Sequence, residues 1–273
     1  MSRGVLYLAF NNQKVNYIAQ ATWNALRVRR HLGVGVSLVT DEASKPNDTS
    51  MFDSVMLVDS KSGGTRKYDH MNADSSAEWK NIGRCNAYEL SPYDQTLMLD
   101  TDYIVNCNQL AMLFDLDYDF LCHREVLDVT DRQNFARDTR FGNTAFPMWW
   151  ATVTYFRKSN LAKDIFDVWK MVEDNWYHYS CLYQFDRDLF RNDYAVSIAL
   201  ATVYGHRLDI PSIPWPLATA FYDVYLNEIG EDKFKMNYVR IDKKELHQNM
   251  ILADYDLHVM NKPDLGKLIG SIA

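Results

Sequence analysis

The chain is poor in cysteine, and none of its cysteines has the spacing of a metal or redox site. Its 273 residues include four cysteines, with no CxxC pair and no Cys/His zinc spacing among them. The four are Cys85, Cys107, Cys122 and Cys181. Because each lies among apolar neighbours, we expect reduced thiols that fill the core of a cytoplasmic protein.

Long apolar runs are missing as well. No stretch approaches the roughly 18 continuous apolar residues that a membrane-spanning helix needs. The N-terminal stretch MSRGVLYLAFNN has one basic residue and an apolar run that is too short for a signal peptide. Both features favour a protein that works in the cytosol.

Positive charge is also in short supply. Lys and Arg total 29 against 36 Asp and Glu, which gives a net charge of −7. Proteins that grip nucleic acid usually present a basic face, because phosphate neutralisation supplies most of the affinity. The short basic groups Arg27/Arg29/Arg30 and Lys243/Lys244 are typical of solvated helix faces. The composition therefore argues against a nucleic-acid partner.

The first hundred residues alternate between apolar runs and a helical period. Residues 4–10 and 36–41 have the continuous apolar character of strands buried on both faces, and apolar residues recur at helical spacing from Asn16 to Gly33. Residues 54–59 and 95–105 are further predicted strands, and 78–90 a predicted helix. This order predicts an α/β fold with parallel βαβ units and helices covering the sheet.

The later part of the chain is less regular. Residues 60–77 are polar and rich in Gly and Ser, which indicates a long loop. We expect a strand at 149–156, helices at 161–177 and 192–205, and a Pro-rich turn at 210–216. One domain over 1–273 is the simplest organisation, with a nucleotide-sugar-binding half at 1–106 and an acceptor-binding half at 107–273.

The most informative stretch is LMLDTDYIV (97–105). Two acids, Asp100 and Asp102, follow an apolar strand, and ligands of open α/β sheets bind outside the carboxyl ends of strands. In extended backbone, residues i and i+2 project to the same side, so these carboxylates can converge on one cation. Hard oxygen ligands suit Mn²⁺ or Mg²⁺, which would neutralise a departing diphosphate. The alternative is a pair of solvated acids in a turn.

The residues around this motif resemble a known enzyme family. The stretch 84–114 is similar to the retaining glycosyltransferases that include glycogenin and the bacterial lipopolysaccharide galactosyltransferases. The matching positions before and after the Asp-x-Asp are Arg84, Tyr88, Leu90, Tyr93, Asn108, Leu113 and Phe114. The resemblance implies a divergent member with the GT-A fold, a Rossmann-like fold with a mixed, mostly parallel central sheet flanked by helices. It also implies metal-dependent sugar transfer from a nucleotide sugar, expected to be a UDP-sugar, to an acceptor hydroxyl with retention.

The same resemblance implies a donor site. The residues that would contact the uracil, ribose and diphosphate are Ala9, Phe10, Asn11, Tyr17, Asp41, Arg84, Asp100, Thr101, Asp102 and Lys262. Arg84 would reach the sugar-phosphate, and His258 in LHVMNKPDL (257–265) would complete the metal shell beside the two carboxylates. Lys262-Pro263 matches the diphosphate-contacting Lys-Pro, with a spacing two residues shorter than in the family.

The acceptor side is defined by fewer residues. Asp193 matches the Asp of a family Asp-Gln pair, with Tyr194 in place of the Gln. Asp193 would be the catalytic carboxylate on the acceptor side, or the general base if the reaction inverts; it is equally typical of an acid that favours a helix N-terminus. Trp149, Trp150 and Trp215 offer faces on which an acceptor sugar can stack, or they pack in the core.

Several functions stay open. A saccharide is the expected acceptor. Hydroxymethylated DNA bases are a second possibility, because aromatic residues can hold a flipped base and Arg124, Arg132, Arg137 and Arg140 can form a local basic patch. Two alternatives belong to other functional classes. One is an Asp-x-Asp phosphatase, whose later Asp pair is missing from this sequence, and the other is a sugar-binding protein that catalyses no reaction.

Overall fold

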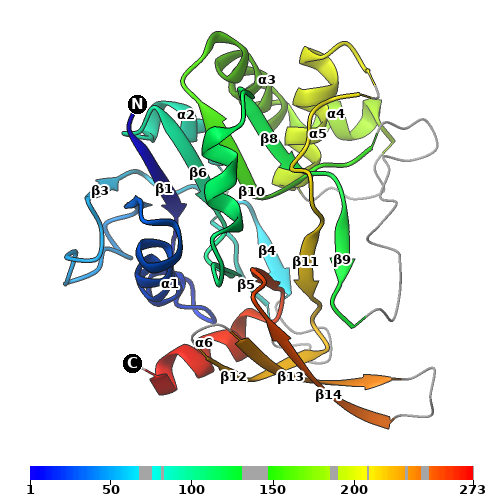
Figure 1. Ribbon diagram of the computed structural model, residues 1–273. Helices are drawn as coiled ribbons and strands as arrows, with labels where there is room; N and C mark the ends of the chain where they lie inside the picture. Colours follow the sequence, from blue (N-terminus) through cyan, green and yellow to red (C-terminus); the bar gives the residue numbers. More distant parts are fainter. Residues whose placement is uncertain are drawn as a thin grey trace.

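A six-stranded sheet with strand order β3-β2-β1-β6-β10-β8 forms the centre of the molecule (Figure 1). The computed structural model describes residues 1–67, 76–80, 83–130, 147–184, 190–207, 209–230, 233–240 and 246–272. The strands of this sheet are β1 (Arg3–Leu8), β2 (Gly35–Thr40), β3 (Ser54–Leu57), β6 (Gln95–Leu99), β8 (Phe120–His123) and β10 (Trp150–Arg157). β10 runs in the direction opposite to the other five strands, which are parallel to one another. The predicted mixed, mostly parallel sheet is therefore confirmed.

Helices cover both faces of this sheet. Val5 and Tyr7 of β1 pack with α1 (Tyr17–Leu32) in one hydrophobic cluster. Leu6 and Leu8 point to the other face and pack with α3 (Asn160–Asp174) and α5 (Asn192–Val203). Burial on both faces explains why β1 is a continuous apolar run.

The ends of α1 follow from the sequence. The side chain of Asn16 accepts a hydrogen bond from the Ala19 N–H at 2.9 Å and caps the helix. Gly33 ends it with φ +65°, a left-handed conformation that glycine adopts without steric cost.

The predicted helix at 78–90 is wrong. Ser76–Glu78 is strand β5, which pairs with β4 (Thr65–Lys67). Of the described residues in 78–90, the helical ones are those of the short η2 (Arg84–Asn86) and α2 (Ala87–Leu90). Trp79 continues the strand pairing through hydrogen bonds with the backbone of Gly63 and Gly64. These non-local bonds override the local helical pattern, and they also place a strand inside the predicted loop at 60–77.

Two other predicted elements are divided. The strand expected at 95–105 ends at Leu99, and β7 (Tyr103–Ile104) belongs to another sheet. The helix expected at 161–177 breaks at Asn175 into α3 and α4 (Trp176–Leu182). The break between β6 and β7 is functionally important, because it creates the turn that carries the Asp-x-Asp.

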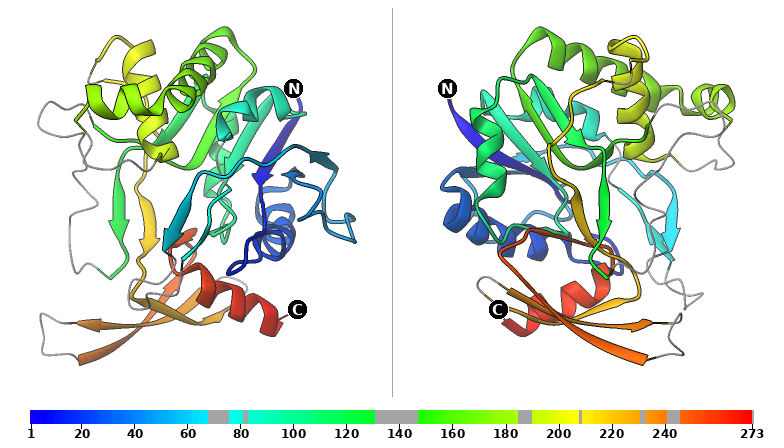
Figure 2. Two further views of the ribbon diagram at one scale, coloured as in Figure 1. Left: turned by 180° about the vertical axis from the view of Figure 1, so that it is seen from behind. Right: turned by 45° about the vertical axis from the view of Figure 1, so that its right-hand side comes forward.

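The last third of the chain adds two smaller sheets and a final helix. The four-stranded sheet β7-β15-β11-β9 combines β7 with β9 (Val126–Asp128), β11 (Leu217–Ala220) and β15 (Leu257–Val259). The three-stranded sheet of β12 (Val224–Ile229), β13 (Lys233–Arg240) and β14 (Leu246–Ala253) lies with α6 (Lys262–Ile272) at one end of the molecule (Figures 1 and 2).

The predicted halves interleave in space. β8 and β10, from the second half, complete the sheet of the first, and β7 pairs with β15 from near the C-terminus. The chain organisation proposed from the sequence remains a prediction. All four cysteines are free thiols, although Cys181 is exposed and does not fill the core as expected. Among the residues described, no helix is long and apolar enough to cross a membrane.

Candidate metal and donor site

The Asp100-Thr101-Asp102 turn lies directly after β6 and is held from several sides. The N–H of Asp100 donates to Thr152 O of β10 at 2.9 Å, and the N–H of Tyr103 donates back to Asp100 O at 3.1 Å. From α1, the Asn24 amide donates to Thr101 O at 2.9 Å and to Tyr103 O at 3.0 Å. Contacts from two elements therefore fix the backbone that aims both carboxylates.

His258 reaches the turn through the pairing of β15 with β7. In this antiparallel pair His258 lies opposite Tyr103, and the N–H of Val259 donates to Asp102 O at 2.9 Å. Ligand atoms of Asp100, Asp102 and His258 all lie within 4.8 Å of one another. Two carboxylates and one imidazole are a suitable donor set for Mn²⁺ or Mg²⁺.

Two cations neutralise the carboxylates of this cluster. Arg84, with 3% of its side chain exposed, bonds Asp100 Oδ1 through Nη1 at 2.5 Å and Ala151 O through Nη2 at 2.7 Å. Lys262 Nζ forms an ion pair with Asp102 Oδ2, and His258 Nε2 lies 3.6 Å from the same oxygen. Each carboxylate therefore already has a positive partner.

The two carboxyl groups differ in acidity. Burial by itself raises the pKa of Asp102, but Lys262 and His258 outweigh it and hold that pKa well below its usual range. Burial raises the pKa of Asp100; the charge of Arg84 opposes this rise and Asp102 adds to it. A cation placed between the two would favour the ionised form of both.

A second buried imidazole belongs to the same region. His123, at the end of β8, is fully buried, and neither of its ring nitrogens has a hydrogen-bond partner within the described structure. Burial, with the charge of His258 as a smaller cause, lowers the pKa of His123 to about 3. This side chain is therefore neutral at neutral pH.

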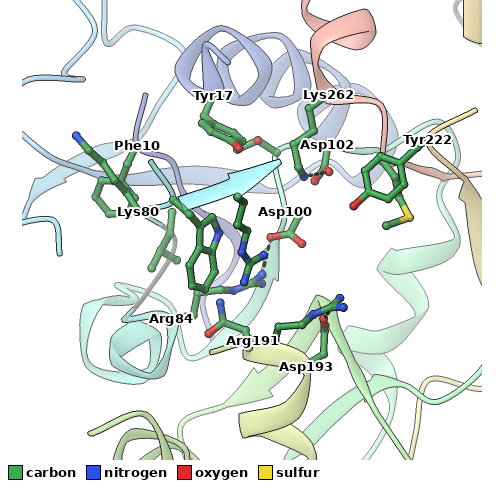
Figure 3. A pocket seen from close by; sticks show the side chains of 16 residues that line it. Phe10, Tyr17, Lys80, Arg84, Asp100, Asp102, Arg191, Asp193, Tyr222 and Lys262 are labelled. Atoms are coloured by element: carbon green, nitrogen blue, oxygen red, sulfur yellow. Dashed lines mark hydrogen bonds and ion pairs between the residues drawn. The ribbon is translucent and has the colours of Figure 1, made fainter. Parts of the chain in front are cut away.

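A cavity opens beside the metal cluster (Figure 3). Of the predicted donor residues, it is lined by Phe10, Tyr17, Arg84, Asp100, Thr101, Asp102 and Lys262. The structure thus brings together residues from the segment after β1, α1, η2, the β6–β7 turn and α6.

Three predicted donor residues do not line this cavity. Ala9 is buried, with its N–H and C=O bonded to Val39 and Thr40. The Asn11 side chain accepts from the Ile18 N–H at 3.0 Å. Asp41 accepts from the Ser44 N–H, the Ser60 hydroxyl and Lys80 Nζ, at 2.8, 2.7 and 3.2 Å. In this structure Asp41 orients Lys80, which does line the cavity.

Asp193 lies at the start of α5, on the wall of the same cavity. Its Oδ1 accepts from the Ala151 N–H at 2.9 Å, and its Oδ2 accepts from Arg191 Nη2 at 2.9 Å. The backbone of Ala151 thus connects Asp193 to Arg84, which bonds Ala151 O. The acceptor-side role of Asp193 remains a prediction.

The predicted stacking residues lie outside the cavity. Trp149 is fully buried in the cluster between the sheet and α5, so it has no face for an acceptor sugar, and its assignment to acceptor binding is corrected. Trp150 and Trp215 are partly buried and pack against the hydrophobic clusters. The Arg124 guanidinium lies 6.0 Å from the Trp149 ring centre. Arg132, Arg137 and Arg140 lie outside the described residues.

The sequence did not reveal eight residues that line the cavity: Leu8, Arg66, Trp79, Lys80, Arg191, Asn192, Tyr222 and Met260. None is part of a recognisable motif, and most come from separate segments. Arg191 lies two residues before Asp193, and this proximity is the one signal in the sequence that points to it.

Comparison with known proteins gives structural neighbours only. No family model matches the sequence, and no curated protein matches it. An active-site mutant of LgtC is similar at 15% identity and a TM-score of 0.46, over 71% of this chain and 68% of that chain. The galactosyltransferase LgtC bound to donor and acceptor sugar analogues is similar at 17% identity and a TM-score of 0.43, over 72% of this chain and 70% of that one.

The glycosyltransferase GlyE of Streptococcus pneumoniae TIGR4 is similar at 14% identity and a TM-score of 0.41, over 78% of this chain. The match spans 45% of the length of GlyE. These TM-scores lie below 0.5, so the case for function is built from the residues of the site.

Proposed function

We propose that this chain is a divergent, metal-dependent glycosyltransferase of the GT-A type, moving a sugar from a nucleotide-sugar donor to an acceptor hydroxyl. One observation carries the proposal. Asp100, Asp102 and His258, which are up to 158 residues apart, present ligand atoms within 4.8 Å of one another beside a cavity lined by five cationic side chains. A metal site next to concentrated positive charge is suited to a diphosphate.

The residues present have distinct roles in this proposal. Asp100, Asp102 and His258 would hold Mn²⁺ or Mg²⁺, which when bound supplies positive charge to the diphosphate leaving group. Arg84 and Lys262 are now paired with the ligand carboxylates. Once those carboxylates are neutralised, both cations can turn to the diphosphate oxygens. Their charge then stabilises the leaving group most strongly as it departs, which is the condition for electrostatic catalysis.

The nucleoside would lie on the side of Phe10 and Tyr17, and a UDP-sugar is the proposed donor. Figure 3 places these two rings on one side of the Asp100 carboxylate, with Arg191 and Asp193 on the other. The sugar and acceptor would then face Arg191 and Asp193. Ala9, Asn11 and Asp41 would act through the backbone and through Lys80, since they do not line the cavity.

Retention is the proposed stereochemistry, and a saccharide the proposed acceptor. Both oxygens of Asp193 already accept a hydrogen bond, which suits a fixed carboxylate that orients a sugar hydroxyl. A product of inverted anomeric configuration, identified by NMR, would make Asp193 the general base and overturn retention.

The alternatives have less support. Within the described residues the metal cluster is completed by an imidazole, whereas an Asp-x-Asp phosphatase needs a later Asp. The predicted basic patch for a DNA acceptor falls mainly outside the described residues, and the net charge is −7. A sugar-binding protein without turnover shares the donor site and differs only in the absence of product.

Calorimetric titration of UDP and other nucleoside diphosphates, with and without Mn²⁺, tests the proposal. We expect metal-dependent binding in the micromolar range that is lost in Asp102→Asn and kept in Asp117→Asn, an exposed acid (95%). Nucleotide release from UDP-sugars with saccharide acceptors then separates an enzyme from a binding protein. If no nucleotide binds with either metal, the proposed function is wrong.

A further inference from the structure

The cavity contains more positive charge than a nucleotide-sugar donor needs. Its described lining has five cationic side chains, Arg66, Lys80, Arg84, Arg191 and Lys262, against three acidic ones, Asp100, Asp102 and Asp193. Asp41, which pairs with Lys80 from outside the lining, reduces the excess from two charges to one. A divalent cation and the two charges of a nucleotide-sugar diphosphate cancel each other. One positive charge remains, in a chain whose net charge is −7.

Two of these cations, Arg66 and Arg191, come from segments that a hydrogen bond joins at the cavity wall. Arg66 is on β4, and its Nη2 donates a hydrogen bond to Phe190 O at 2.9 Å. Phe190 is the residue directly before Arg191. The Arg66 guanidinium also lies 3.4 Å from the centre of the Trp79 ring, which fixes its plane. Arg191 is held by Asp193 at 2.9 Å, with 27% of its side chain exposed. Both guanidinium groups are therefore oriented at the cavity wall.

The start of α5 adds to this positive character. Arg191 is the residue before the helix, and Asn192 and Asp193 of its first turn also line the cavity. The N-terminus of a 12-residue helix presents backbone N–H groups and the positive end of the helix dipole. Planar guanidinium groups match the geometry of a carboxylate or phosphate and can bind it through paired hydrogen bonds.

We propose that the substrate portion facing Arg66 and Arg191, which is the transferred sugar or the acceptor, carries a carboxylate or phosphate bound by these two arginines. The proposal rests on the proposed glycosyltransferase function, because that function places the nucleoside at Phe10 and Tyr17 and the sugar at the opposite side. Arg66 and Arg191 are specificity-determining residues in this proposal, whereas Arg84 and Lys262 serve the diphosphate of any donor.

Matched pairs of ligands test the proposal by calorimetry in the presence of Mn²⁺. Comparing the affinity for UDP-glucuronate with that for UDP-glucose tests the donor. Comparing the affinity for galactose 6-phosphate with that for galactose, with UDP present, tests the acceptor. We expect the anionic member of one pair to bind at least about tenfold more tightly, as for other charge pairs in partly desolvated sites. The pair that shows the difference identifies which substrate carries the anion.

Variants show whether the arginines cause the preference. Arg66→Gln and Arg191→Gln should each remove most of the difference while UDP affinity stays within about threefold. Arg207→Gln is the matched control, because Arg207 forms the same i, i+2 pair with Asp209 but is exposed (64%). Arg191→Lys keeps the charge and should show a preference for the anionic ligand between those of the wild-type protein and Arg191→Gln. It replaces Arg191→Gln in the test if that variant lowers the melting temperature.

Equal affinity for the members of both pairs, or a preference that survives in the Gln variants, would overturn the inference. Tighter binding of a single-stranded oligonucleotide than of either anionic sugar would overturn it too. In each case normal Mn²⁺-dependent UDP binding would leave the proposed glycosyltransferase function standing, and loss of UDP binding in the wild-type protein would remove both.

Discussion

The two sides of the cavity are built differently. On the metal side, Asp102 has 1% of its side chain exposed and lies beside strands β7 and β15, whose pairing aligns it with His258. On the other side, Arg66 comes from a three-residue strand and Arg191 from the residue before a helix, with 27% of the Arg191 side chain exposed. The metal ligands are thus aligned by strand pairing before any ligand binds, whereas the two arginines are oriented by side-chain contacts at the cavity wall.

Removing Arg84 should have the largest effect, because this residue connects the two sides. Its guanidinium bonds both Asp100 and Ala151 O, and the Ala151 N–H holds Asp193. In Arg84→Gln we expect turnover to fall by about a hundredfold or more, as when a buried transition-state donor is lost. Steady-state kinetics measure this, with melting temperature as the control for folding. Unchanged kcat would place Arg84 outside the diphosphate site.

The substitution His258→Gln should weaken metal binding and leave the arginine side of the cavity unchanged. The variant loses a ligand from the cluster, and we expect the affinity for Mn²⁺ to fall at least about tenfold, or ~1.4 kcal/mol. Titration of Mn²⁺ by electron paramagnetic resonance, in the presence of UDP, measures it. An exposed histidine, as in His178→Gln, is the control. Equal affinities in the wild-type protein and in His258→Gln would show that Asp100 and Asp102 bind the ion without the imidazole.

The substitution Asp193→Asn should affect turnover through the arginine side of the cavity and leave the metal side unchanged. The Asn carbonyl can still accept from the Ala151 N–H, but the ion pair with Arg191 is lost. We therefore expect UDP affinity to stay the same while turnover falls about tenfold or more, which is less than the loss of a general acid or base would cost. Calorimetry and kinetics on one preparation separate the two quantities. A fall in UDP affinity would show that the two sides are not independent.

Stability at acid pH should depend on His123, and this is the smallest expected effect at neutral pH. The folded pKa of about 3 lies below the ordinary 6.5, so the folded state binds fewer protons between these values. The free energy of unfolding should therefore fall as pH drops from about 6.5 towards 3, by up to about 1.4 kcal/mol per pH unit. Urea unfolding of His123→Leu should show a shallower slope than the wild-type protein. An identical slope would show that His123 does not titrate on unfolding.

The sequence alone determined the parts that depend on local pattern. The apolar runs that became β1, β2 and β6 are visible because both of their faces are buried, and Asn16 and Gly33 mark the ends of α1. Asp100 and Asp102 follow from position, since acids that come directly after a buried strand lie at the ligand-binding edge of the sheet.

The family resemblance pointed to His258 as a partner of these acids, but only the tertiary structure shows how distant residues reach them. The pairing of β15 with β7 brings His258 to Asp102, and the pairing of β4 with β5 sets Arg66 over Trp79. The structure also shows that Trp149 is buried in the core, whereas other aromatic residues line the cavity. Strand pairing and burial depend on contacts between residues far apart in the chain, so no local pattern contains them.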